Sequence, residues 1–369
     1  MNETPAKKYN NRSRIVRFIL ESGETSKMEI AKELNLSMPT VLQNIKELTE
    51  EGFIKENGEY ASTGGRKAKT LVICENIKYA AGLDITQNHI SIVLINLNGE
   101  VIKSTRKRKK FQNNLEYYNE ISKEIDGFIE EDRIEKEKIL GLGISLPGII
   151  NYDSMLLVKS HALQVENISL KMMEQIMKFP VYFENDANAA LMAEKRENKQ
   201  EAVYLSLSDT VGGAICMKGN LFLGKNRKAG EFGHMTMIPN GRQCYCGKRG
   251  CIDAYCSALS LLGDKDMTLE QFMDKVTKKE KEYSQCWDEY LDNLAIVVTN
   301  LRMAYDTDII LGGYIGTYLK DYMLELGKKI LEYNIFDRDV SYLKNCIFQK
   351  EVSAVGVGKY FIDQYIKNL

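Results

Sequence analysis

Apolar residues recur at helical spacing three times within the first 52 residues of the chain. The three apolar stripes are Ile15, Phe18 and Ile19; Ile30, Ala31 and Leu34; and Val41, Ile45 and Leu48. Ser26 followed by Glu29 is the signature of a capping box at the start of the second helix. Ser37 is a good N-cap for the third helix, and Pro39 falls in its first turn, where its missing N–H does no harm. Three short helices with a tight turn between the second and third predict a helix-turn-helix.

The next residues favour a β-hairpin wing, with Asn57-Gly58 as its predicted turn. Basic residues beside Gly64-Gly65 would form a flexible tip suited to phosphates or the minor groove. If the third helix enters the major groove, its outward polar side chains can pair with bases. The candidate DNA contacts are Ser37, Thr40, Gln43, Asn44, Arg66, Lys67 and Lys69. Lys and Arg outnumber Asp and Glu by only two over residues 1–73, so a three-helix protein-interaction module remains the alternative.

The rest of the chain repeats one strand pattern. Residues 79–102 alternate an apolar strand, a polar turn, a second strand, an Asn98-Gly99 turn and a third strand, and residues 202–223 repeat the plan. This duplication indicates two related α/β lobes with a cleft between them for a small ligand. We expect a DNA-binding domain at 1–75, a first lobe at 76–190 completed by a C-terminal helix at 353–369, and a second lobe at 191–352.

A candidate site lies where the apolar strand around residue 183 ends and a helix begins. Glu184, Asn185 and Asp186 stand at that junction, and polar side chains at the carboxyl end of a strand are common site positions in α/β folds. The alternative for Asn185 and Asp186 is a simple helix N-cap. Residues 139–150 and 307–316 read as further buried strands, each followed by a glycine-containing turn.

One histidine and three cysteines follow the spacing H-x9-C-x-C-x4-C. His234, Cys244, Cys246 and Cys251 are the closed set of soft ligands that holds structural zinc. Gly247 and Gly250 allow the tight turns that bring the last cysteine back to the metal. Cys256 could replace one ligand, and the bland alternative is a set of free cysteines beside a surface histidine. Glu231 and Asp253 flank the loop, which indicates a rigid polar surface that holds a ligand.

Composition narrows the class of protein. The chain has 369 residues, 44% hydrophobic and 27% charged, with a net charge of −1, so contact with nucleic acid must come from a local patch. No apolar run approaches a membrane span, and the N-terminus is polar. We therefore expect a cytoplasmic protein with no membrane partner and with reduced thiols, which favours zinc over disulfides. The basic run at residues 103–110 predicts a solvated strand face, with a second DNA-backbone contact as the alternative.

Three motifs together resemble the ROK family of sugar-responsive repressors and sugar kinases. They are G-E-F-G-H with C-Y-C-G-K-R-G-C-I-D, E-N-D-A-N-A-A, and I-I-L-G-G. The winged helix with T-G-G-R-K is similar to the repressor branch. The resemblance implies an α/β fold in which a winged helix-turn-helix precedes a two-lobed sugar-kinase/actin-like (ribonuclease H-like) platform with a structural zinc loop. It also implies a sugar site formed by Asn185, Asp186, Glu231, His234, Asp253, Gly148 and His161.

Both phosphate loops depart from the kinase pattern. The first, D-x-G-G-T in family kinases, is Asp84-Ile85-Thr86-Gln87-Asn88. The second, usually G-T-G-x-G-G-G, is residues 208–214, where Thr210 replaces a glycine and Asp209 adds a negative charge. A phosphate cradle needs backbone N–H groups without a Cβ in the way. We therefore expect no kinase activity and no catalytic residue, with Asp186 as the vestigial base position. The family's glutamate in G-C-x-E is the shorter Asp253 here.

These features predict a sugar-responsive regulator of transcription, which we expect to be a repressor of genes for xylose or hexose metabolism. Its partners would be a double-stranded DNA operator and a sugar or sugar-derivative effector, and its cofactor a structural Zn2+. A homodimer or a dimer of dimers is expected, because one winged helix reads few base pairs. One alternative is an active ROK-type sugar kinase with an attached DNA-binding domain. Another is a zinc-stabilised scaffold without a small ligand.

Overall fold

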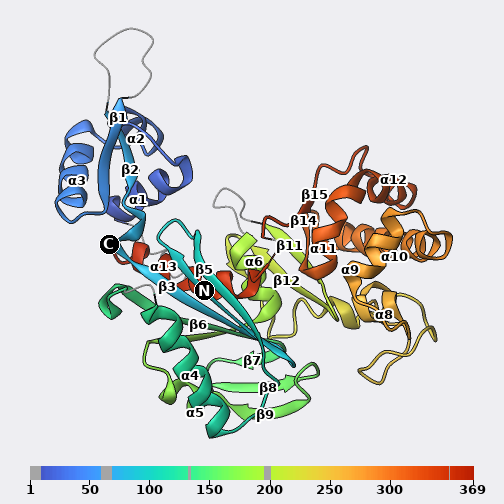
Figure 1. Cartoon of the computed structure of the whole chain (residues 1–369). Helices are drawn as coiled ribbons and strands as arrows, with labels where there is room; N and C mark the ends of the chain where they lie inside the picture. Colours follow the sequence, from blue (N-terminus) through green and yellow to red (C-terminus); the bar gives the residue numbers. More distant parts are fainter. Residues whose placement is uncertain (1–9, 60–68, 132–133, 195–200, 349) are drawn as a thin grey trace.

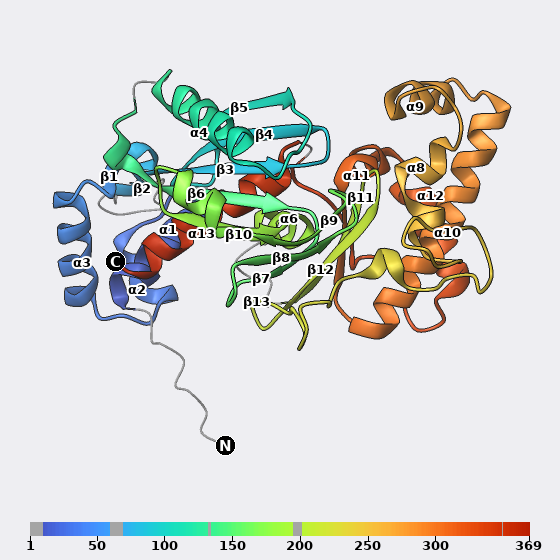
Figure 2. The same cartoon turned by 90° about the horizontal axis from the view of Figure 1, so that it is seen from below.

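The computed structural model describes residues 10–59, 69–131, 134–194, 201–348 and 350–369. Three bodies follow one another along the molecule: an N-terminal domain, a first α/β lobe and a second α/β lobe (Figures 1 and 2). In both views the N-terminal domain and the second lobe lie at opposite ends, with the first lobe between them. No helix within the described ranges combines the length and the apolar character needed to cross a membrane.

The N-terminal domain is a winged helix-turn-helix, as predicted. Its elements are α1 (Asn11–Ser22), α2 (Lys27–Glu33), α3 (Met38–Glu50), β1 (Ile54–Glu59) and β2 (Lys69–Ile73). The capping box at α2 is present: the Ser26 side chain accepts from the Glu29 backbone N–H, and the Glu29 side chain accepts from the Ser26 backbone N–H. The Ser37 side chain caps α3 by accepting from the Thr40 backbone N–H. Local sequence therefore fixes the start of both helices.

The wing differs from the prediction at one point. Asn57 and Gly58 lie inside β1 rather than at the hairpin turn. Gly58 has φ +71°, and the pairing with β2 shifts register between Glu56 and Glu59. The pair therefore forms an irregularity in the strand, because a glycine with positive φ suits a β-bulge as well as a turn. The connection between the two strands falls within residues 60–68, outside the described residues.

Two five-stranded sheets share one topology, which confirms the predicted duplication. In the first sheet, the antiparallel meander β3-β4-β5 is extended beyond β3 by the parallel strands β6 and β10. In the second, β11-β12-β13 is extended beyond β11 by the parallel strands β14 and β15. The bounds are β3 (Tyr79–Ile85), β4 (His89–Asn96), β5 (Val101–Arg108), β6 (Ile139–Leu146), β10 (Val181–Asn185), β11 (Ala202–Leu207), β12 (Val211–Met217), β13 (Asn220–Leu221), β14 (Asp308–Gly312) and β15 (Leu343–Asn345).

A third, antiparallel sheet of three strands follows β6. It consists of β7 (Ile149–Asn151), β8 (Leu156–Ser160) and β9 (Val165–Ser169). The sequence analysis did not predict this sheet, because its strands are short and their polar residues do not alternate cleanly. The sheet matters for the site because His161 directly follows β8.

Helices cover both lobes. The α-helices are α4 (Leu115–Glu130), α5 (Lys171–Ile176), α6 (Asp186–Glu194), α7 (Asp253–Cys256), α8 (Ala258–Leu262), α9 (Leu269–Thr277), α10 (Lys281–Tyr305), α11 (Gly313–Leu319), α12 (Met323–Tyr333) and α13 (Val352–Lys367). Single 3-10 turns occur at Glu75–Ile77, Lys136–Lys138, Phe232–His234 and Lys320–Tyr322. Helix α13 packs on β3, β4 and β6 of the first sheet, and α6 packs on both α13 and the strands β11 and β12. These two helices therefore form the layer that joins the two sheets.

The approach between α6 and α13 is very close. A Cβ on Gly356 of α13 would lie 1.7 Å from the carbonyl oxygen of Ala189 in α6. The Ser353 hydroxyl also donates to the backbone carbonyl of Asp186, at 3.0 Å. Because Asp186 is the first residue of α6, the start of α13 is bonded directly to the start of the helix that carries the candidate site.

The far end of α13 packs against the winged helix-turn-helix domain (Figure 1). Ile362 and Ile366 belong to the same buried cluster as the core of the helix-turn-helix. Phe53 stacks on Tyr365 with ring centroids 5.7 Å apart. The winged helix-turn-helix domain and the first lobe therefore share one continuous hydrophobic core, and α13 runs from that core to α6.

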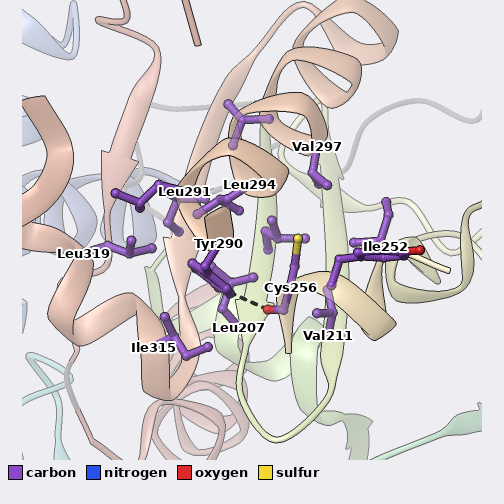
Figure 3. Close-up of a cluster of buried hydrophobic side chains, with 14 of the residues drawn as sticks. Leu207, Val211, Ile252, Cys256, Tyr290, Leu291, Leu294, Val297, Ile315 and Leu319 are labelled. Carbon is purple, nitrogen blue, oxygen red and sulfur yellow. Dashed lines mark hydrogen bonds between the residues drawn. The ribbon is translucent and has the colours of Figure 1, made fainter. Parts of the chain in front are cut away.

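The second lobe has its own core (Figure 3). Apolar side chains of α10, including Leu291 and Leu294, meet Ile252 and Cys256 from the segment that follows the cysteine-rich loop. The Tyr290 hydroxyl donates to the Cys256 carbonyl at 3.1 Å. The cysteine-rich loop is thus anchored at its exit in the core of the lobe.

The basic run at residues 103–110 lies on and just beyond the edge strand β5. Lys103, Lys107 and Lys109 pair with glutamates of α4 and its C-terminal end. Because exposed ion pairs of this kind belong to an ordinary solvated surface, the geometry favours the prediction of a solvated strand face over the alternative of a second DNA contact.

Candidate functional site

The cysteine-rich loop brings the four predicted metal ligands together. The ligand atoms of His234, Cys244, Cys246 and Cys251 all lie within 4.8 Å of one another. His234 Nδ1 is 3.9 Å from Cys244 Sγ, and Cys246 Sγ is 3.8 Å from Cys251 Sγ. Isolated bridges pair Gln243 with Arg249 and Thr236 with Cys251, which folds the loop back on itself.

The donor set fits zinc. Zn–S bonds of about 2.3 Å in a tetrahedron place neighbouring sulfur atoms about 3.8 Å apart, the separation between Cys246 and Cys251. Burial raises the pKa of the Cys244 thiol, so a thiolate at that position needs a cation beside it. Cys256, the alternative ligand, is fully buried in the core of the second lobe and is not part of the cluster that the described residues form.

Asn185 acts as the N-cap of α6 and as a link to the strand β6. Its side-chain oxygen accepts from the backbone N–H groups of Ala187 and Asn188, at 2.9 and 3.1 Å. Its amide nitrogen donates to the Gly148 carbonyl and to the Asp186 carboxylate, both at 3.0 Å. Asn185 is therefore an N-cap, as the alternative interpretation held. The same side chain also orients Asp186 and Gly148.

Gly148 occupies a position that other residues would not fit. Its φ is +125°, and a Cβ there would lie 2.4 Å from the Lys159 carbonyl oxygen. The turn between β6 and β7 therefore stays close to the end of β8. This approach keeps His161, two residues after Lys159, near the Gly148 end of the site.

Asp186 and Glu231 form an acidic pair across the two lobes. Burial raises the pKa of Asp186. Glu231 is solvent-exposed, yet partial burial of its carboxyl group and the nearby Asp186 carboxylate raise its pKa too. Two carboxylates that repel one another favour a ligand with hydroxyl donors and disfavour an anion.

Asp253 is directed toward the β12 end of the second sheet. Its carboxylate accepts from the Val211 backbone N–H at 2.7 Å, and only 4% of the residue is exposed. Burial raises its pKa to about 6. Asp253 thus ties the cysteine-rich loop to the turn that corresponds to the second phosphate loop. This bond uses one of the two carboxylate oxygens that could otherwise meet a sugar.

His161, His234 and Tyr245 form an aromatic cluster between the lobes. His161 follows β8 of the first lobe, whereas His234 and Tyr245 belong to the cysteine-rich loop. The ring centroids lie 5.6 Å apart for the two histidines, 5.8 Å for His161 and Tyr245, and 5.4 Å for His234 and Tyr245. The sequence analysis missed Tyr245, whose place between two cysteines gave no signal of its own.

A second bridge between the lobes was also missed. Arg227, in the segment after β13, lies 3.3 Å from Asp153 and stacks over the Tyr152 ring at 4.4 Å. The Tyr152 hydroxyl donates to the buried carboxylate of Glu184, next to the predicted site residue Asn185. Only the pairing of segments more than seventy positions apart reveals this contact.

The residues at the first phosphate-loop position are already engaged in hydrogen bonds within the protein. Asp84 accepts from the Ser145 hydroxyl at 2.7 Å. Thr86 makes a tight turn with His89: its backbone N–H and its hydroxyl both contact the His89 carbonyl, at 2.9 and 3.1 Å. The Thr86 backbone N–H is therefore already bonded within the protein.

The second phosphate-loop region is satisfied internally as well. The Val211 backbone N–H donates to Asp253. At the start of α11, the Gly313 backbone N–H donates to the Tyr204 hydroxyl and the Tyr314 backbone N–H to the Ser208 hydroxyl, each at 3.1 Å. An incoming phosphate would have to displace these acceptors.

Four of the predicted DNA contacts lie on and beside α3. Ser37 and Gln43 are exposed, and Asn44 is half-buried and donates to the Thr40 carbonyl at 2.7 Å. The Ser37 and Thr40 hydroxyls are hydrogen-bonded to each other, at 2.8 Å. Lys69 is paired with Glu56, while Arg66 and Lys67 lie outside the described residues.

An apolar side chain that the sequence analysis did not select stands among these positions. Leu42, next to Gln43, is 47% exposed. An exposed leucine on a helix that reads the major groove can contact a thymine methyl group.

The sequence profile of the ROK family matches residues 80–356. The chain belongs to the ROK family. A profile described as a winged helix-turn-helix DNA-binding domain matches residues 10–55. The ROK match spans both sheets and the cysteine-rich loop, and the helix-turn-helix match covers α1 to α3. The resemblance inferred from the motifs is therefore confirmed.

The ROK relatives with known names include repressors. The xylose repressor of Caldicellulosiruptor bescii is 26% identical over 374 residues, which cover 94% of each chain. The N-acetylglucosamine repressor of Escherichia coli O157:H7 is 28% identical over 252 residues, 66% of this chain and 61% of the relative. Among solved structures, a ROK family transcriptional regulator described as a homologue of the E. coli MLC protein superposes with a TM-score of 0.75 at 18% identity, over 97% and 96% of the two chains. This last likeness confirms the fold.

Proposed function

We propose that the protein is a sugar-responsive repressor of transcription that acts on carbohydrate-utilisation genes. The observation that carries this proposal is the union, along one chain, of a winged helix-turn-helix with a ROK platform, an arrangement shared with a xylose repressor over 94% of both chains. The DNA-reading helix would be α3, with Ser37, Thr40, Gln43 and Asn44 toward the bases. Arg66, Lys67 and Lys69 would contact phosphates, and the protein would act in the cytoplasm, where its operator is.

The effector site would lie between the two lobes. Its residues would be Asn185, Asp186, Glu231, His234, Asp253, Gly148 and His161. Burial raises the pKa values of Asp186 and Glu231, and the Asp186 carboxylate adds to the rise at Glu231. Carboxylate oxygens accept hydrogen bonds from hydroxyl groups well, but they repel a phosphate group. This supports a neutral sugar as the effector, rather than a sugar phosphate.

We also propose that zinc occupies the His234, Cys244, Cys246 and Cys251 cluster as a structural ion. The separations of the ligand atoms support this assignment. When bound, zinc would hold the loop rigid and thereby fix His234, whose other ring nitrogen faces the Tyr245 hydroxyl. The loop has little apolar core of its own, so metal binding would contribute to its folding.

The protein would have no kinase activity. Backbone N–H groups at both phosphate-loop positions already donate to protein acceptors, and Thr86 and Thr210 carry side chains where a cradle needs glycine. The alternative, a sugar kinase with an attached DNA-binding domain, is favoured by the retained Asp186. Incubation with ATP, magnesium and a sugar panel tests it: turnover that Asp186→Asn abolishes would establish the kinase.

The protein would bind its operator as a homodimer or as a dimer of dimers. Paired winged helices bind two half-sites about one helical turn of DNA apart, or a multiple of it. A sugar can shift the DNA equilibrium only through its different affinities for the two states of the protein. The route we favour runs through α6 and α13, because α13 is bonded to the start of α6 and packs at its other end on the DNA-binding domain.

The test combines both ligands. Full-length protein would be titrated onto DNA from its own promoter region, with and without xylose, glucose and N-acetylglucosamine, at two salt concentrations. We expect specific binding that one sugar changes by about tenfold or more. Absence of specific DNA binding at low salt would contradict the repressor, and absence of any sugar-induced thermal shift would favour the zinc-stabilised scaffold.

A further inference from the structure

Tyr245 lies among the residues of the proposed sugar site, although its sequence position marks it only as the residue between two cysteines. Its hydroxyl oxygen is 3.4 Å from His234 Nε2. Its ring also packs against the rings of His234 and His161, with centroids 5.4 and 5.8 Å away. Two of the proposed sugar ligands, one from each lobe, therefore lie against this one phenol.

His234 has only one ring nitrogen that points away from the cysteine cluster. Nδ1 faces Cys244 Sγ at 3.9 Å, within the cysteine cluster. Nε2 faces the Tyr245 hydroxyl. Any sugar hydroxyl that bonds to His234 must therefore approach Nε2 and share its surroundings with the Tyr245 ring.

The Tyr245 ring contacts His161 of the opposite lobe. His161 packs against both Tyr245 and His234 at interplanar angles of 67° and 71°. The backbone near His161 is fixed in turn by the close approach of Gly148 to Lys159. Tyr245 is still 51% exposed, so part of the ring remains accessible to a ligand. The rings of Tyr245 and His161, one from each lobe, therefore border the approach to His234 Nε2.

We propose that Tyr245 determines effector specificity by excluding any substituent larger than a hydroxyl group from the sugar carbon that faces His234. This inference rests on the proposed function, and it narrows the effector to unsubstituted aldoses. Sugars with an acetamido group at that carbon would collide with the ring. The relatives include a xylose repressor and an N-acetylglucosamine repressor. The presence or absence of an acetamido group is therefore a difference between sugars that is relevant to this family.

The test measures affinity for three sugars in the zinc-loaded, full-length protein by titration calorimetry. The probes are xylose, glucose and N-acetylglucosamine, and the proteins are wild type, Tyr245→Ala and Tyr245→Phe. In the wild type we expect xylose or glucose to bind and N-acetylglucosamine to bind weakly. Tyr245→Ala should improve N-acetylglucosamine relative to glucose by about tenfold or more, because the ring is gone. Tyr245→Phe should keep the wild-type ranking, because it keeps the ring.

Tyr333→Ala is the matched control. Tyr333 is 47% exposed on α12 and is not one of the proposed sugar-site residues, so its removal should leave all three affinities unchanged. Zinc content and melting temperature would be measured for each variant. If Tyr245→Ala does not fold, Tyr245→Leu takes its place, with a smaller gain expected.

The outcomes separate the two proposals. An unchanged ranking in Tyr245→Ala, an equal gain for every sugar, or a loss of the ranking in Tyr245→Phe would overturn the role of Tyr245 while leaving the sugar site intact. Failure of all three sugars to bind the wild type, with zinc present and the protein folded, would instead overturn the proposed effector class, and the specificity inference with it.

Discussion

Folding strongly raises the pKa of one carboxyl group, that of Asp84. Burial raises the pKa to about 7, against the opposing effect of the hydrogen bond from Ser145 and with a contribution from Asp186. An aspartate in the unfolded chain titrates near pH ~4. The folded protein therefore binds more protons between these values, and it loses stability as pH rises through that window.

We expect Asp84→Asn to raise the melting temperature relative to wild type at pH 8, because it removes the buried charge. The difference should shrink toward pH 5, where Asp84 is protonated in the folded protein. Thermal melts at several pH values measure this difference. Asp321→Asn, which replaces an exposed carboxylate, should show no such trend. An equal difference at both pH values would contradict the expected titration of Asp84.

Cys251 tests the metal site at the same scale. Cys251→Ser should lose bound zinc and lower the melting temperature by about 5 °C or more, because the metal contributes to the folding of the loop. Mass-spectrometric metal content and a thermal melt measure both effects. Cys286→Ser is the control, since Cys286 lies on α10 outside the ligand cluster. Full zinc occupancy in Cys251→Ser would exclude this set of ligands.

At the scale of elements, the contact between α6 and α13 decides how the two sheets are joined. A methyl group at residue 356 would meet the Ala189 carbonyl oxygen at 1.7 Å, and that atom belongs to backbone. We expect Gly356→Ala to destabilise the protein by about 2 kcal/mol or more, because neither helix can yield without moving its sheet. Denaturant unfolding measures the change in the free energy of unfolding.

Gly127 provides the matched control for this substitution. It also lies within a helix, α4, but a Cβ there would meet nothing within 4 Å. Gly127→Ala should therefore stabilise the protein by about 0.5–1 kcal/mol, through the ordinary preference of helices for alanine. Similar effects of the two substitutions would mean that α13 does not pack as tightly on α6 as the structure has it.

At the scale of the whole molecule, α13 connects the candidate effector site to the DNA reader. Its C-terminal half meets the winged helix through the Phe53–Tyr365 stack, and Arg17 lies 3.9 Å from Asp363. A stacked aromatic pair is worth about 1 kcal/mol beyond the area it buries. This interaction energy is small enough for the contact to break or form between two states of the protein. It is also large enough to favour one of those states over the other.

We expect Tyr365→Ala to reduce the sugar-induced change in operator affinity by about fivefold, while the protein still binds both ligands. Fluorescence anisotropy with operator DNA, with and without sugar, measures this change. Tyr333→Ala should leave it unaltered. A sugar response of wild-type size in Tyr365→Ala would show that the signal takes another route.

The sequence by itself determined the local features. The capping box at Ser26 and Glu29, the cap at Ser37 and the spacing of the cysteine ligands each depend on residues within about twenty positions of one another, so their physical requirements are written in the sequence. The doubled strand pattern also predicted the two sheets, because alternation and buried runs report burial directly. Local sequence gave a wrong prediction at Asn57-Gly58, where one backbone conformation serves both a turn and a bulge, and it did not predict the sheet formed by β7, β8 and β9.

Tertiary structure alone decided which distant segments share the site. His161 meets Tyr245, Arg227 reaches Tyr152, and Asp253 turns toward Val211. No periodicity records such pairings, because they depend on how two lobes and the layer formed by α6 and α13 pack together. The chain therefore specifies its elements and its ligand set locally. The shape of the site, and its connection to the winged helix-turn-helix, arise only when the two lobes pack together.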